Sequence, residues 1–215
     1  MAIDILIVED TELQQFAAKE AFPESTLVTN LRDAKSALQQ QPKAVLSDLY
    51  IPSGLTESEE APLKQDILDT LQNYVKETFG LQGSRNSIVG RVLSTVVDSL
   101  GLKTKEEFFA HFKDDALINT PLFKRSIEEG IERYKQEQDY LLLHSRMEKG
   151  EYQLPFGILV YEECRRLNIP CITVTSAYHH GPEFEPFSRR LGPYVDQLVN
   201  GKKQWKQAYE LLMRK

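Results

Sequence analysis

Three short hydrophobic runs lie near the N-terminus of the chain, and two amphipathic stretches separate them. The runs cover residues 3–8, 26–29 and 44–47, and their nearly continuous aliphatic character is typical of strands that are buried on both faces. The stretches 13–21 and 32–38 repeat their apolar side chains with the period of a helix. This alternation, with short connections, predicts parallel strands that are joined by right-handed crossovers.

The pattern changes after Gly54. Residues 55–60 are polar and predict a turn, and the segment after them contains four helical stretches with no strand between them. These stretches are expected to begin near Pro62, Asn86, Thr104 and Thr120, at prolines, a polar pair and a capping box. Their apolar faces can pack on one another, so residues 55–152 are expected to form an inserted helical module.

Strand and helix alternate again from about residue 153 onward. A helix over 157–167 precedes an apolar strand at 170–176, and a fifth strand is expected near 195–199 before a closing amphipathic helix. The two ends of the chain, 1–54 and 153–215, therefore predict one discontinuous α/β domain with a doubly wound, five-stranded parallel sheet.

Three acidic residues stand at the predicted carboxyl ends of strands. Glu9 and Asp10 follow the first strand, and Asp48 follows the third. Ligands of open α/β sheets bind at that edge, and three carboxylates that converge there repel one another unless a cation neutralises them. Mg²⁺ suits such a site, and Asp48 can then act as a nucleophile toward a phosphoryl group. The alternative is that Asp10 and Asp48 only cap the segments that follow them.

These motifs resemble the receiver domain of two-component response regulators. Residues 5–10, ILIVED, are similar to the first strand and acidic pair of a receiver, and residues 44–52, AVLSDLYIP, to its phospho-acceptor strand. Residues 157–176 are similar to the next helix and strand of the family. The resemblance implies a flavodoxin-like sheet of order 2-1-3-4-5.

The resemblance also implies the roles of individual residues. Glu9, Asp10 and Asp48 would bind Mg²⁺, Asp48 would accept a phosphoryl group, and Thr175 would close on that group. The phosphodonor would be a histidine kinase or a similar protein of a phosphorelay. Phosphorylation would then shift the population of loop conformations, and the helical insertion would serve as the output or partner surface.

Two features depart from the receiver pattern. Receivers carry a lysine at the end of the fifth strand, where this chain has Asn200, with Lys202 and Lys203 just beyond. We expect that an adjustment of the loop lets Lys202 serve in this role. Ordinary receivers also lack a module after the acceptor strand, so a receiver-like interaction module that works without phosphorylation is an alternative.

Two adjacent histidines, His179 and His180, follow the fourth predicted strand at the edge that carries the acids. Neutral imidazole can ligate a transition metal or act as a base near neutral pH, so either residue is a candidate member of the site. The other interpretation is that both are exposed loop residues.

Two other classes of function fit parts of the pattern. Haloacid-dehalogenase-type phosphohydrolases also use a strand-end aspartate and carry a cap module, but Tyr50 stands where those enzymes have an acidic general acid. A non-enzymatic interaction module is the second class. It would form a homodimer if aromatic residues of the insertion made an interface instead of a core, namely Phe108, Phe109, Phe112 and Phe123.

The composition narrows the possible partners and location. The chain carries 32 acidic and 26 basic residues, which gives a formal net charge of −6 and argues against nucleic acid or an anionic membrane as a direct partner. No run approaches the roughly 18 apolar residues of a membrane helix. Cys164 and Cys171 are expected to be small buried residues in a reducing compartment, so we expect a cytoplasmic protein.

Overall fold

The computed structural model describes residues 4–79, 95, 101, 107, 110–111, 120–175, 184–196 and 198–214. The helices are α1 (Glu12–Ala21), α2 (Leu31–Leu38), α3 (Glu57–Phe79), α6 (Pro121–Glu148), α7 (Gly157–Arg166), α8 (Glu185–Ser188) and α9 (Trp205–Met213). The strands are β1 (Ile5–Val8), β2 (Thr26–Val28), β3 (Ala44–Ser47), β4 (Cys171–Val174), β5 (Tyr194–Val195), β6 (Leu198–Val199) and β7 (Lys202–Lys203). The helices predicted to begin near Asn86 and Thr104 lie outside these residues, as do Phe108, Phe109, Phe112 and the side chain of Phe123.

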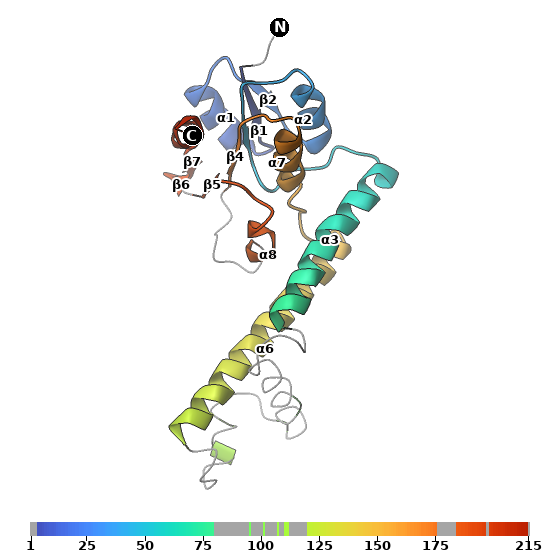
Figure 1. Ribbon diagram of the computed structural model, residues 1–215, viewed down its shortest axis with the longest axis vertical. Helices are drawn as coiled ribbons and strands as arrows, with labels where there is room; N and C mark the ends of the chain where they lie inside the picture. Colours follow the sequence, from blue (N-terminus) through green and yellow to red (C-terminus); the bar gives the residue numbers. More distant parts are fainter. Residues whose placement is uncertain are drawn as a thin grey trace. The chain divides into compact units, whose positions relative to one another are not determined.

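The chain folds into two compact units, Met1–Asp69 with Arg146–Lys215, and Thr70–Ser145. The first unit holds a five-stranded parallel sheet of order β2-β1-β3-β4-β5, which confirms the predicted class and strand order. Helices α1 and α9 pack on one face of the sheet and α2 and α7 on the other (Figure 1). This arrangement explains the continuous hydrophobic runs, because each central strand is covered on both sides.

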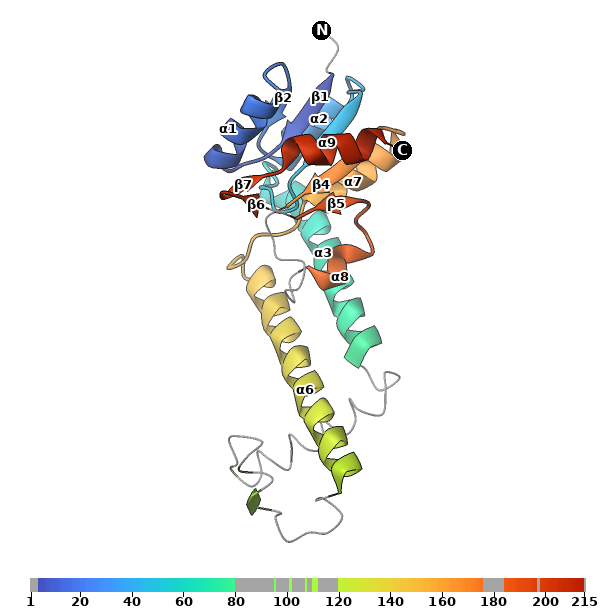
Figure 2. The same ribbon diagram turned by 90° about the vertical axis from the view of Figure 1, so that its left-hand side faces the viewer.

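The expected fifth strand is divided in the structure. β5 ends at Val195, and the chain then forms a separate antiparallel hairpin from β6 and β7. The expected single strand over 195–199 is therefore wrong beyond Val195. Figure 2 shows this hairpin beside α1 and the start of α9.

The start of α3 also differs from the expectation. Glu59 supplies one half of a capping box, because its Oε2 accepts hydrogen bonds from Thr56 N at 2.9 Å and from Thr56 Oγ1 at 2.6 Å, while Glu59 N donates to the backbone Thr56 O. The helix therefore begins at Glu57 and contains Pro62 in its interior. The predicted turn over residues 55–60 is therefore wrong from Glu57 onward, and the prediction that Pro62 opens the helix is wrong, because the cap at Thr56 starts the helix earlier.

The unit Thr70–Ser145 contains the part of α3 from Thr70 onward and the part of α6 up to Ser145. Its described aromatic contacts join these helices: Tyr74 meets Tyr140 edge-on at 5.1 Å, and Phe79 lies 5.7 Å from the same ring. Ile127, Tyr140 and Leu143 are buried. In the part of the chain that the structure describes, no helix combines the length and the hydrophobicity needed to cross a bilayer.

Candidate functional site

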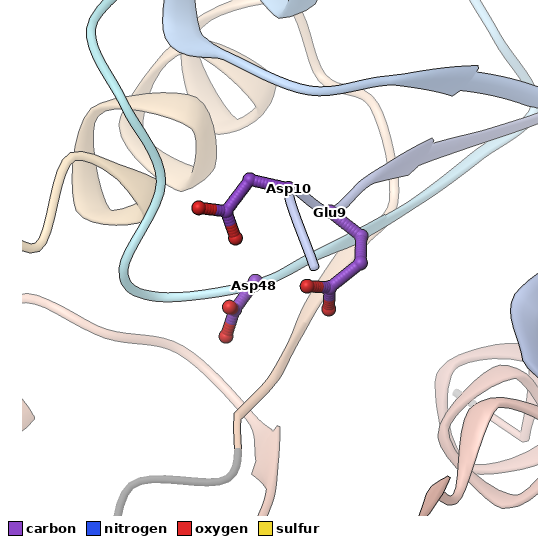
Figure 3. A group of neighbouring side chains, drawn as sticks. All are labelled: Glu9, Asp10 and Asp48. Carbon is purple, nitrogen blue, oxygen red and sulfur yellow. The ribbon is translucent and has the colours of Figure 1, made fainter. Parts of the chain in front are cut away.

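The three predicted acids lie together at the carboxyl edge of the sheet. β1 and β3 are neighbours in register, with Val8 opposite Ser47, and Asp48 N donates to Val8 O at 2.8 Å. Glu9 and Asp10 therefore leave β1 directly beside Asp48, as Figure 3 shows. One carboxylate oxygen of each residue lies within 4.8 Å of the others, so the cluster could hold a metal ion.

Lys203 supplies a positive charge inside this cluster. Its Nζ lies 2.5 Å from Glu9 Oε2 and 2.8 Å from Asp48 Oδ1. The side chain of Lys203 is 2% exposed, that of Glu9 is fully buried and that of Asp48 is 9% exposed, so these charges have little solvent to screen them. The ammonium group offsets one of the three negative charges and leaves the cluster attractive to a further cation.

The hydrogen bonds indicate which oxygens remain available to a ligand. Glu9 Oε1 accepts from Thr11 N at 2.9 Å and Glu9 Oε2 from Lys203, so both of its oxygens are engaged. Asp48 Oδ1 accepts from Leu49 N at 2.7 Å and from Lys203, whereas Asp48 Oδ2 has no hydrogen-bond partner among the described residues. Asp10 is held only by contacts of 3.4 Å in this part of the chain. Asp48 Oδ2 and the Asp10 carboxylate are therefore the least engaged of the converging ligand atoms.

The buried position of Asp48 changes its ionisation. Burial raises the pKa of Asp48 to about 6, against the lowering effect of Lys203, and the nearby Glu9 carboxylate adds to the rise. A cation bound beside Asp48 would act in the opposite direction and favour the ionised form at neutral pH. The ionisation of Asp48 therefore depends on whether a cation is bound at the site.

A tight turn decides which lysine reaches the acids. Asn200 and Gly201 join β6 to β7 with φ of 53° and 74°, the positive values that a two-residue hairpin turn of type I′ requires. Successive side chains of β7 point to opposite sides. Lys202 Nζ therefore pairs with Glu20 at 2.8 Å, and Lys203 turns inward. The sequence suggested Lys202 for the site, but the structure places Lys203 there, and Asn200 occupies an exposed turn.

Gln14 of α1 holds this hairpin in place. Its Nε2 donates to Gly201 O at 2.8 Å, and its Oε1 accepts from Lys203 N at 2.8 Å. Gln14 was not among the residues that the sequence suggested for the site, and Lys203 stood there only as the neighbour of the favoured Lys202. The Asn200-Gly201 pair was the available signal for the hairpin, whereas nothing in the local pattern marks Gln14.

Of the other predicted site residues, the structure describes Thr175 but not the two histidines. Thr175 follows β4 at the same edge, buried, and its N donates to Val195 O at 2.9 Å. The register of β3 with β4, with Ser47 opposite Thr173, puts Thr175 near the level of Asp48 along the sheet. His179 and His180 lie outside the described residues.

The donor set indicates the class of ion. Among the described residues, the converging ligand atoms are carboxylate oxygens, which suit a hard cation such as Mg²⁺ or Ca²⁺ better than a thiolate- or imidazole-preferring metal. When bound, such an ion would be held by Asp10 and Asp48, with Glu9 adding negative charge beside it.

Comparison with protein-family models gave no match for this chain. Comparisons with curated proteins and with solved structures gave no significant match either.

Proposed function

We propose that this protein is a receiver-like signalling protein in which Asp48 accepts a phosphoryl group in the presence of Mg²⁺. The observation that carries the proposal is the position of Lys203, whose ammonium group bridges Glu9 and Asp48 at 2.5 and 2.8 Å. The receiver resemblance requires a lysine beside the acceptor, and the linear sequence had offered Asn200 at that place. The β6–β7 hairpin brings the ammonium group of Lys203 beside Asp48, and this position supports the proposal.

The residues of the site have distinct parts in this chemistry. Asp48 Oδ2 forms the new phosphorus–oxygen bond, while the bond from phosphorus to the donor nitrogen of a phosphohistidine breaks and its electron pair returns to the imidazole. Lys203 then pairs with an oxygen of the transferred group, and the hydroxyl of Thr175 closes on another. Mg²⁺, when bound by the acids, supplies charge neutralisation for the transferring group. A histidine kinase or similar phosphodonor would be the partner, and the helical insertion would form the output surface.

The structure offers no support for the phosphohydrolase alternative. Tyr50, at the position of the general acid in those enzymes, packs edge-on against Tyr152 at 6.1 Å between ring centroids. A phenol also has a pKa near 10, far above that of a useful acid at neutral pH. The phosphorylation-independent module remains the alternative to be tested.

Thermal unfolding with beryllofluoride, a mimic of the aspartyl phosphate, tests the proposal. With Mg²⁺ and beryllofluoride at 100 times the dissociation constant, the wild type should gain about 2.7 kcal/mol and show a raised Tm. Asp48→Asn should lose the beryllofluoride shift. The exposed Asp69→Asn on α3 is the matched control and should keep it. A wild type that responds to Mg²⁺ but not to beryllofluoride would leave only a metal-binding module.

A further inference from the structure

The chain returns from the helical insertion directly alongside the acceptor strand. Ile51 pairs with Pro155 in a parallel bridge, and Gly157 N donates to Leu49 O at 2.9 Å. A Cβ at Gly157 would stand 2.0 Å from Asp48 O, so this position requires glycine. The return segment, residues 152–157, is therefore packed against the backbone of Asp48 itself.

Gln153 of the return segment reaches one of the three acids. Its Nε2 lies 3.4 Å from Asp10 Oδ2, across a separation of 143 residues in sequence. Within the described ranges, the other Asp10 oxygen has only a 3.4 Å contact with Thr11 Oγ1, whereas Glu9 and Asp48 accept bonds of 2.5 to 2.9 Å. Asp10 is thus the least firmly held carboxylate, and Gln153 is placed to orient it.

A second line of contacts joins the acceptor to the same segment. Tyr50, two residues after Asp48, packs edge-on against Tyr152, and the guanidinium of Arg146 lies 5.4 Å from the centre of the Tyr152 ring. Tyr152 and Gln153 also line a cavity of about 290 Å³ with Ile51.

We propose that Gln153 is a positioning residue for a divalent cation at the acid cluster, so that the return segment of the helical insertion sets the affinity of the site. This inference rests on the proposed function only in that the cluster binds a cation. Gln153 fixes the Asp10 carboxylate through a neutral amide, which orients the ligand without cancelling its charge. If the contact of Gln153 with Asp10 strengthens cation binding, the bound cation must strengthen that contact by the same free energy. Cation binding should therefore stabilise the return segment.

Cation affinity in the full chain tests this role. Mn²⁺ binding is measured by electron paramagnetic resonance of the free ion, and Mg²⁺ by competition. Residues that orient metal ligands typically contribute 10- to 100-fold in affinity, and the long contact here places the expected loss for Gln153→Ala at about tenfold. Gln65→Ala is the matched control, because the amide of Gln65 also contacts an aspartate, Asp69 at 2.8 Å, away from the cluster. The cation affinity of this variant should equal that of the wild type.

Hydrogen exchange of the amides of Phe156 and Gly157 gives a second measurement. If Gln153 had a purely structural role, its substitution would not change how these amides respond to Mg²⁺. Saturating Mg²⁺ should slow their exchange in the wild type and not in Gln153→Ala. Gln153 is exposed, so the variant should fold, and Gln153→Leu keeps the bulk of the side chain without its donor. Equal Mn²⁺ affinities in wild type and Gln153→Ala would overturn the inference and leave the proposed function intact. A wild type that binds no divalent cation would overturn both.

Discussion

At the scale of single residues, the site is a set of buried charged groups, and its net charge depends on the ionisation of Asp48 and on whether a cation is bound. Glu9, Asp48 and Lys203 are removed from solvent, and Asp48 carries the cost of that burial in its raised pKa. Removing one partner of such a set generally leaves another charge uncompensated. Asp48 is the exception, because Lys203 would still pair with Glu9 after its loss.

We expect Asp48→Asn to stabilise the protein at neutral pH in the absence of divalent cations. The pKa of Asp48 is raised in the folded state. The contribution of Asp48 to the free energy of unfolding is therefore fully present below the unfolded-state pKa of about 3.9 and is lost as the pH rises through about 6. Asparagine carries no charge at any pH. Urea unfolding should therefore show a gain of roughly 1–3 kcal/mol at pH 7.5 that disappears near pH 4.

The exposed Asp69→Asn variant serves as the control for this pH dependence and should show no comparable gain at pH 7.5. If Asp48→Asn were less stable than the wild type at pH 7.5, the ion pair of Asp48 with Lys203 would outweigh the desolvation of Asp48. The direction assigned to its pKa would then be wrong.

At the scale of elements, the β6–β7 hairpin determines which cation enters the site. Its register places Lys203 opposite Leu198, and α1 holds the turn through Gln14. The ammonium group of Lys203 also lies 5.7 Å from the centre of the Trp205 ring, at the start of α9. Since the chain has one tryptophan, its emission can report on the position of Lys203.

Gln14→Leu should loosen this hairpin. The substitution removes two hydrogen bonds and leaves Lys203 N without its acceptor, which costs about 1–3 kcal/mol for a buried group. We expect a lower free energy of unfolding, a changed emission of Trp205 and a weaker response to beryllofluoride. Gln39→Leu, at an exposed position after α2, is the control. A Gln14→Leu protein with wild-type emission and stability would show that α1 does not hold the hairpin.

At the scale of the whole molecule, the chain divides into two compact units, and the boundaries of this division fall within α3 and α6. The acid cluster and Trp205 belong to the α/β unit, whereas Thr70–Ser145 forms the other. Chains with separate units commonly depart from two-state unfolding. A ligand of the acid cluster stabilises directly only the unit that binds it.

Calorimetry should accordingly resolve two transitions, with Mg²⁺ raising the Tm of one. Trp205 emission identifies that transition, because the tryptophan lies in the α/β unit. At 100 times its dissociation constant, Mg²⁺ should add about 2.7 kcal/mol to this unit, and Asp10→Asn should remove most of the effect. A single transition that moves as one with Mg²⁺ would mean that both units unfold together.

The sequence by itself determined the class of fold and the acidic members of the site. Continuous hydrophobic runs reflect burial on both faces of a strand, and the end of such a run can be read without long-range information. Residues 3–8 and 44–47 and the acids after them could therefore be located. The strand order followed from the receiver resemblance and is confirmed. The start of α3 was misplaced, although Thr56 and Glu59 carried the signal of a capping box.

Only the tertiary structure decided which basic and amide groups complete the site. Lys202 and Lys203 are chemically identical, and the choice between them depends on the register of a hairpin, where a shift of one residue reverses every side chain. The contacts of Gln14 with Lys203 and of Gln153 with Asp10 span 189 and 143 residues, so no local pattern encodes them. Such contacts exist because the sheet and the return segment bring distant parts of the chain to one edge.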